Sequence, residues 1–333
     1  MSTSRYAAVL ATVLLLLGAG ACSDSGDEGG GPATTTTSTA TTAAPTTDVT
    51  VAGSAGCGGT APVTDGHLLQ GSLESSGGTR AYLVYVPDSY RPDVPAPVAY
   101  VFHGAGSNKE EQLVYSRFQP YAEEDGALLV LPDALGQPMR WSPLGPAIAG
   151  VEGVNDLVFF DDLSATIEDE LCVDPDRVLI TGMSSGGFMS GSLACTRSDR
   201  ITVVGPVTAT LAAPALCGVA EPVPYVYFHG TDDAVMSYDG GPGTPGPVLE
   251  TSQFWADHNG CVGPPTDERI GADVVHRSWS GCDAPTDLYT VEGGGHAWPG
   301  AIAVGRLGHT TEAIDATEII WQTFRYAWPT EAG

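Results

Sequence analysis

The stretch RVLITGMSSGG, residues 177–187, joins a short apolar run to a Gly-x-Ser-x-Gly motif centred on Ser184. The apolar run predicts a β-strand, and a helix is expected to begin after the motif. A sharp turn between a strand and a helix lifts a serine hydroxyl above the sheet, where it can act as a nucleophile. Flanking glycines let the two backbones approach closely. The stretch therefore predicts a nucleophilic serine at the end of a central strand.

Apolar runs alternate with amphipathic stretches from residue 67 onward. This alternation predicts the α/β class, with a mostly parallel central sheet and helices on both of its faces. The expected strands are residues 81–86, 98–102, 127–131, 177–181, 201–207, 223–228 and 287–291. The expected helices are residues 109–124, 156–171, 185–196, 248–258 and 311–326. Residues 133–155 are rich in Gly and Pro without a clear period, which predicts a long functional loop or lid.

A serine nucleophile needs two backbone N–H groups directed at the oxyanion that forms when it attacks a carbonyl group. Ser185 follows the nucleophile and is expected to supply the first. The second is expected from the loop HGAG after the strand 98–102, with Ala105 as the first choice and Gly106 as the next. His103 precedes the nucleophile in the chain, and this order favours a structural role for it.

Two carboxylates follow the expected strand 223–228, at a position where a nucleophilic serine of this kind has its acidic partner. Either Asp232 or Asp233 can accept a hydrogen bond from a histidine and stabilise its imidazolium form. His296 lies further along the chain in the glycine-rich loop GGGHAWPG. His296 is therefore the predicted base, and the other histidines are expected to be surface or packing residues.

Trp141 and Trp298 lie near these motifs and are candidates for an aromatic wall against an acyl or aryl group, although buried packing is an equal alternative for each. No organic cofactor is indicated. No metal is predicted either, because the sequence contains no Cys-x-x-Cys pair and no His-x-x-x-His pair.

Four segments in this order resemble the esterase/poly(3-hydroxybutyrate) depolymerase family, which is related to the feruloyl and acetylxylan esterases of carbohydrate esterase family 1. The segments are HGAG at 103–106, GMSSGG at 182–187, HGTDD at 229–233 and GGHAWPG at 294–300. The resemblance implies an α/β-hydrolase fold and ester hydrolysis through an acyl-enzyme. It also selects Asp233 as the acid, because the family's acid lies four residues after the histidine of the His-Gly pair.

The chain departs from the family's pattern at two places. Asn155-Asp156 stands where paired aspartates are common, and Trp141-Ser142 stands where a tryptophan-asparagine pair is common. Both places lie in or beside the long loop. The resemblance therefore does not decide whether the natural ester comes from a polyester or a plant polysaccharide, or whether it is a small molecule or a polymer. Two other functions also stay open. One is an inactive surface-binding lipoprotein on the same scaffold, and the other is a lipase or peptidase of the same fold.

Residues 1–21 carry one positive charge at Arg5 followed by an apolar run, which predicts an export signal. The run ends in small residues directly before Cys22 and resembles the bacterial lipoprotein processing site, where the cysteine is acylated. Residues 22–56 are dominated by small residues and threonine, which predicts a disordered tether. Residues 57–330 are expected to form the catalytic domain. An ordinary cleaved signal followed by a disordered spacer, and hence a secreted protein, is the alternative.

The remaining six cysteines can form three disulfides in an exported chain. Cys261 and Cys282 are predicted to pair, because they flank one expected strand region in matching Gly-Cys contexts. Six cysteines allow many connectivities, so the sequence does not decide the partners of the other four. These are Cys57, Cys172, Cys195 and Cys217.

The chain has 13 basic and 40 acidic residues and a formal net charge of −27. Such a charge repels polyanions and argues against nucleic acid or an anionic bilayer surface as a partner. Contact with a membrane is therefore expected only through a lipid on Cys22, at the outer face of the cell membrane.

Overall fold

The computed structural model describes residues 52–62, 64–145, 150–211, 214–218, 220–241 and 246–328. All of them belong to the unit Val49–Gly333. The export signal, Cys22 and most of the expected tether lie outside the described residues. Within the described ranges, no helix is long and apolar enough to cross a membrane.

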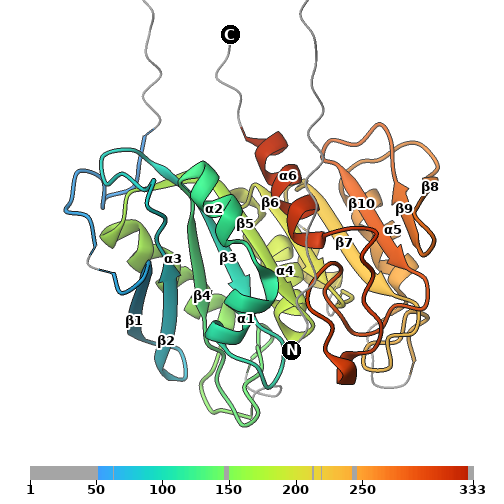
Figure 1. The fold of residues 1–333 in the computed structure, drawn as a ribbon, viewed down its shortest axis with the longest axis horizontal. Coiled ribbons are helices and arrows are strands. Elements are labelled where there is room, and N and C mark those ends of the chain that lie inside the picture. Colours follow the sequence, from blue (N-terminus) through green and yellow to red (C-terminus); the bar gives the residue numbers. More distant parts are fainter. Residues whose placement is uncertain are drawn as a thin grey trace, which may run out of the picture. The chain divides into compact units, whose positions relative to one another are not determined.

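The described strands form one sheet in the order β1-β2-β4-β3-β5-β6-β7-β10-β9-β8 (Figure 1). Their bounds are Leu68–Ser75 (β1), Gly78–Tyr85 (β2), Ala96–Phe102 (β3), Leu128–Pro132 (β4), Val173–Met183 (β5), Val203–Val207 (β6), Tyr225–Gly230 (β7), Thr266–Ile270 (β8), Val274–Ser278 (β9) and Thr286–Val291 (β10). The strands from β4 to β10 in this order are parallel, whereas β1 and β2 at one edge and β9 and β8 at the other run antiparallel to their neighbours. The mostly parallel sheet predicted from the sequence is confirmed.

Helices cover both faces of this sheet. Their bounds are Lys109–Ser116 (α1), Gln119–Asp125 (α2), Asp156–Glu170 (α3), Ser185–Thr196 (α4), Val248–His258 (α5) and Ala316–Ala327 (α6). Helices α3, α4 and α5 share one buried apolar cluster, and α1, α2 and α6 share the other. Strand β3 supplies both, because Tyr100 and Phe102 point into the first and Ala99 and Val101 point into the second.

Two helices differ from their predicted bounds. The single helix expected at 109–124 is divided into α1 and α2, because Arg117 adopts a left-handed backbone conformation with φ 54°. Pro120 in the first turn of α2 lacks the N–H that a continuous helix needs. The helix expected from residue 311 begins at Ala316, where Asp315 accepts hydrogen bonds from the first free N–H groups.

Three disulfides join described cysteines: Cys57–Cys172, Cys195–Cys217 and Cys261–Cys282. The third is the pair named from the sequence. The first fixes the start of the described chain to the beginning of β5, where Ser54 also donates its backbone N–H to the carbonyl of Val173 at 2.9 Å. Gly56 likewise donates its backbone N–H to the carbonyl of Glu168 at 2.9 Å, so two residues assigned to the tether are hydrogen-bonded to the domain.

We expect the double substitution Cys57→Ser/Cys172→Ser to lower the free energy of unfolding by about 4–5 kcal/mol, because this disulfide closes a long loop in the unfolded chain. The two cysteines are 115 residues apart, whereas Cys261 and Cys282 are 21 apart. Denaturant unfolding without reductant measures the loss. The matched control Cys261→Ser/Cys282→Ser should lose about 3 kcal/mol. A larger loss in the control would contradict the loop-length explanation.

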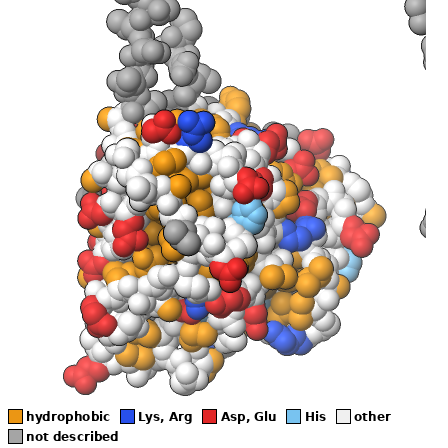
Figure 2. All heavy atoms as spheres, turned by 60° about the vertical axis from the view of Figure 1, so that its left-hand side comes forward, with side chains coloured by type: hydrophobic (Ala, Val, Ile, Leu, Met, Phe, Trp, Pro, Cys, Tyr) orange, Lys and Arg blue, Asp and Glu red, His pale blue; other side chains and the backbone are white. Residues whose placement is uncertain are grey.

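Acidic side chains are distributed over the face of the molecule drawn in Figure 2, with apolar side chains between them. Several basic side chains are already paired with carboxylates, among them Arg269 with Glu292 and Arg277 with Asp267. Exposed pairs of this kind contribute little to stability. They do reduce the positive charge available to an anionic partner.

Candidate active site

Ser184 lies in a strained turn between β5 and α4. Its backbone angles are φ 54° and ψ −116°, a region that residues other than glycine rarely adopt. A Cβ at Gly182 would lie 2.7 Å from the backbone of Gly186, and a Cβ at Gly186 would overlap the carbonyl oxygen of Phe102. Both flanking positions therefore require glycine. This is the sharp strand-to-helix turn expected from the sequence, and it projects a serine above the sheet.

A cavity of about 550 Å³ lies at the carboxyl ends of the parallel strands, and Ser184, Ala105 and His296 line it. Its walls are largely apolar and come from α1 and from the segment 302–307, which follows the His296 loop. The apolar wall residues are Val114, Tyr115, Met183, Ile302, Val304 and Leu307. The carboxylates of Glu110 and Glu111 and the guanidinium of Arg306 also line it. A cavity of this size and polarity fits a small organic group.

His296 and Asp233 form a buried hydrogen bond beside the cavity. The distance from His296 Nδ1 to Asp233 Oδ2 is 2.7 Å, and the two residues are 6% and 5% exposed. Because the carboxylate accepts, Nδ1 carries the proton and Nε2 is left to accept one. Among the described residues the Ser184 hydroxyl makes no hydrogen bond to this ring. Such bonds are often long before a substrate binds and shorten in its complex.

The local backbone and His229 hold Asp233 in place. The second oxygen, Oδ1, accepts the N–H groups of Val235 and Met236, each at 2.8 Å. Burial acts to raise the pKa of Asp233, but hydrogen bonds from His229 and His296 outweigh it and lower the pKa below the ordinary value. Asp233 is therefore ionised. The neighbouring Asp232 is exposed, so the structure brings only one of the two candidate acids to the histidine.

Two further histidines are buried and have structural contacts. The ring of His229 accepts a hydrogen bond from the Tyr227 hydroxyl at 2.8 Å and donates one to the Met236 carbonyl at 2.7 Å. His229 was predicted to be a surface or packing residue, and it is buried, but its contact with Asp233 was not predicted although its place in the HGTDD motif was a signal. Nε2 of His103 accepts the N–H of Ala134 at 3.0 Å, so its Nδ1–H donates to its neighbour's carbonyl. Burial lowers the pKa of His103 and keeps it neutral, as its predicted structural role requires.

Two backbone N–H groups next to the nucleophile are unpaired. Within the described part of the chain, neither the Ala105 N–H nor the Ser185 N–H donates a hydrogen bond. The other candidate, Gly106, donates its N–H to the carbonyl of Met139 at 2.9 Å and is therefore occupied. Free N–H groups beside a serine are the donors that an oxyanion needs.

Of the two roles left open for Trp141 and Trp298, an aromatic wall or buried packing, the structure supports packing for both. Trp141 is 1% exposed and donates its indole N–H to the His103 carbonyl at 2.9 Å. Trp298 is fully buried and donates its indole N–H to Thr317 at 2.9 Å. Neither lines the cavity. Both satisfy their N–H inside the protein and pack edge-on against the phenyl rings of Phe102 and Phe118.

No three His, Cys, Asp or Glu side chains in the described ranges converge on a point where they could hold a metal ion. The groups that face the cavity near Ser184 are a hydroxyl, an imidazole and backbone N–H donors, with a carboxylate behind the imidazole. This set can activate a serine hydroxyl and stabilise an oxyanion.

The chain is similar to known esterases in sequence and in structure. No family model matches the chain. The chain is 29% identical over 293 residues to feruloyl esterase C of Emericella nidulans, with 84% of this chain and 94% of the relative covered. It is 29% identical over 264 residues to feruloyl esterase D of Neurospora crassa, with 74% and 82% covered. An acetyl xylan esterase from Aspergillus awamori is similar in structure, with TM-score 0.54, 16% identity and 69% and 94% covered.

The sheet order, the strained serine and the solved structures define the chain as a protein of the α/β-hydrolase fold. A thermostable esterase with TM-score 0.53 and 14% identity, covering 79% of this chain and 63% of that one, has the same fold. The two sequence relatives named above are esterases, and the chain matches 94% and 82% of their lengths. The protein is a carboxylic ester hydrolase.

Proposed function

We propose that Ser184, His296 and Asp233 form the catalytic triad of this esterase. The observation that carries the proposal is the buried His296–Asp233 hydrogen bond beside a strained serine in one cavity. The Ser184 oxygen attacks the ester carbonyl carbon while His296 Nε2 takes its proton, and Asp233 stabilises the imidazolium that forms. The N–H groups of Ala105 and Ser185 bind the oxyanion of the tetrahedral intermediate.

The intermediate then collapses and the C–O bond to the alcohol breaks. His296 returns its proton to the leaving alcohol oxygen, and the acyl group remains on Ser184. Water enters, gives a proton to His296 and attacks the acyl-enzyme. In the second tetrahedral intermediate the bond from the acyl carbon to Ser184 Oγ breaks, and His296 gives its proton to that oxygen, which releases the carboxylic acid and restores the serine hydroxyl.

We further propose that the acyl group is an aromatic one of the feruloyl type. Two observations support this choice over acetyl or 3-hydroxybutyryl esters. Several sequence relatives have the name feruloyl esterase. The apolar walls of the cavity and its volume of about 550 Å³ are suited to a planar ring.

We expect kcat/KM for methyl ferulate to exceed that for a 3-hydroxybutyrate trimer or for p-nitrophenyl palmitate by about tenfold or more. A ring fully buried against apolar walls contributes about 1.5–3 kcal/mol, and tenfold corresponds to 1.4 kcal/mol. Steady-state hydrolysis of the three esters and of acetylated xylan measures the ranking. The Ser184→Ala variant gives the background rate. A preference for the trimer would favour the polyester alternative, and a preference for palmitate would favour a lipase.

We also propose that the enzyme is exported and lipid-anchored through Cys22. The support is the signal-like sequence of residues 1–21 and the three disulfides, which are typical of exported proteins.

We expect Cys22→Ser to move the protein from the membrane fraction to the medium, because the predicted tether, residues 22–56, offers no other apolar anchor. Immunoblotting of both fractions measures the shift. Ser25→Ala in the same segment is the control and should stay with the membrane. An unchanged distribution of the Cys22→Ser protein would remove the lipid anchor and favour secretion after an ordinary signal.

A further inference from the structure

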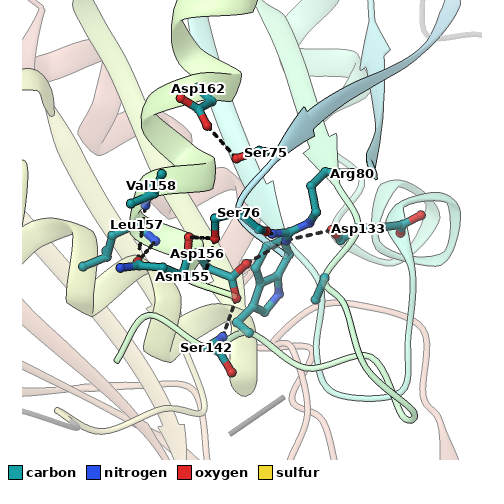
Figure 3. Close-up of polar contacts among 12 residues, drawn as sticks. Ser75, Ser76, Arg80, Asp133, Ser142, Asn155, Asp156, Leu157, Val158 and Asp162 are labelled. Carbon is teal, nitrogen blue, oxygen red and sulfur yellow. Dashed lines mark hydrogen bonds and ion pairs between the residues drawn. The ribbon is translucent and has the colours of Figure 1, made fainter. Parts of the chain in front are cut away.

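A buried ion pair joins the two ends of the loop 133–155 (Figure 3). Arg80 of β2 and Asp156, the first residue of α3, have fully buried side chains, and Arg80 Nη2 lies 2.7 Å from Asp156 Oδ1. The same nitrogen donates to the carbonyl of Asp133 at 3.3 Å. The guanidinium lies 3.7 Å from the ring centre of Phe159. Arg80 therefore holds the start of the loop and the residue that follows its end.

Asp156 also holds the middle of the loop. Its second oxygen accepts the N–H of Ser142, and its own N–H donates to the Ser142 carbonyl at 3.3 Å (Figure 3). The adjacent Trp141 donates its backbone N–H to Ser185 Oγ at 3.0 Å and its indole N–H to the His103 carbonyl at 2.9 Å. A series of hydrogen bonds therefore leads from the buried ion pair to both segments that carry the free N–H groups.

Stability alone is a weak reason for this ion pair. The cost of removing two charges from water largely offsets their attraction, so well-packed apolar side chains of similar volume are often as stable. Charge-assisted hydrogen bonds, however, are shorter and about twice as strong as neutral ones. Strong bonds hold their partners in place, and an oxyanion hole needs this because its donors must be in position before the negative charge develops.

We propose that Asp156, held by Arg80, is a positioning residue for the oxyanion hole. It acts through Ser142 and Trp141 on the segments that carry the Ala105 and Ser185 N–H groups. Neither member of the ion pair lines the cavity, so the effect does not involve contact with substrate. This role rests on the proposed function, because it presupposes that those two groups bind an oxyanion.

The Asp156→Asn variant keeps the shape of the side chain and removes its charge. Complete loss of one oxyanion donor lowers kcat by about 10²–10³, so displaced donors should lower it by about 10–100-fold. We expect KM to change by less than about threefold, because the ester's ground state does not need the hole. The inhibition constant of phenylboronic acid, which forms a tetrahedral adduct with a serine, should rise in parallel with the fall in kcat. The inhibition constant of the product acid should stay the same.

Asp162→Asn is the matched control. Asp162 lies on the same helix α3 and accepts a hydrogen bond from Ser75 at 2.6 Å, away from the loop (Figure 3). Its kcat and boronate inhibition should equal those of the wild type.

Ser185→Ala is the second variant and serves if Asp156→Asn does not fold. It removes the acceptor of the Trp141 N–H and keeps the Ser185 N–H. A lower kcat with unchanged KM supports the proposal, and the double variant should lose less than the product of the single losses because both act in one series. Unchanged kcat per folded enzyme in both variants would overturn the proposal, even if their melting temperatures fell. If the wild type neither hydrolyses esters nor binds the boronate, the proposed function itself fails.

Discussion

We expect Ser184→Ala to lower kcat by about three to six orders of magnitude, because in the proposed mechanism this hydroxyl carries the acyl group. His296→Ala should have an effect of similar size, since the serine hydroxyl is a weak nucleophile without a base. The two losses do not multiply in the double variant, because triad members act as a unit. Hydrolysis of methyl ferulate measures kcat, and circular dichroism verifies that each variant is folded.

His309→Ala is the matched control for the histidine. Its imidazole is 55% exposed and faces Asp273 rather than the cavity. This variant should keep the wild-type kcat within about twofold, as surface substitutions usually do. A fluorophosphonate probe adds a second measurement, since it should label the wild type and His309→Ala but not Ser184→Ala. Labelling that persists in Ser184→Ala would place the nucleophile elsewhere. A wild type that is not labelled would favour the inactive binding protein.

We expect Asp233→Asn to lower kcat by about three to four orders of magnitude, because an amide in this place favours the wrong tautomer of His296 and cannot stabilise the imidazolium. The neighbouring Asp232→Asn should change kcat by less than about threefold, since an exposed side chain away from the histidine has no such role. The comparison is informative because the two substitutions have the same chemistry at adjacent positions. Steady-state rates with a neutral ester provide the measurement.

The opposite ranking of these two variants would contradict the assignment of the acid. The lowered pKa of Asp233 keeps the wild-type carboxylate ionised between neutral and mildly acidic pH, so both variants are compared with an enzyme whose acid is charged. A melting-temperature measurement on both variants separates a loss of structure from a loss of catalysis.

The sequence predicts the central part of the site because the signals there are local. Ser184 has a strand, two glycines and a helix within a few residues, and each of these restricts the backbone. His296 follows from its glycine-rich loop and from chain order. Asp233 needed the family resemblance, because nothing local distinguishes it from Asp232. In the structure the difference is clear, since the turn buries one carboxylate and exposes the other.

The features that the sequence did not predict depend on contacts between distant residues. The direction of the Trp141 side chain is set by the His103 carbonyl, 38 residues away. Arg80 and Asp156 are 76 residues apart, and the Asn155-Asp156 pair noted in the sequence does not indicate Arg80 as its partner. The break at Arg117 is a single backbone angle within a helical pattern. Periodicity describes one segment at a time, so it carries no information on such partners.

The disulfide between Cys57 and Cys172 has a mechanical consequence. Cys172 directly precedes β5, whereas Ser184 directly follows this strand. The disulfide therefore lies at the amino end of β5, and the cavity lies at its carboxyl end. A pulling force on the chain before Cys57 passes into the sheet through this disulfide, at the amino end of β5. The load therefore bypasses the strained turn and the loops around the cavity. Tension on the residues that precede Cys57 should therefore leave the geometry around Ser184 unchanged.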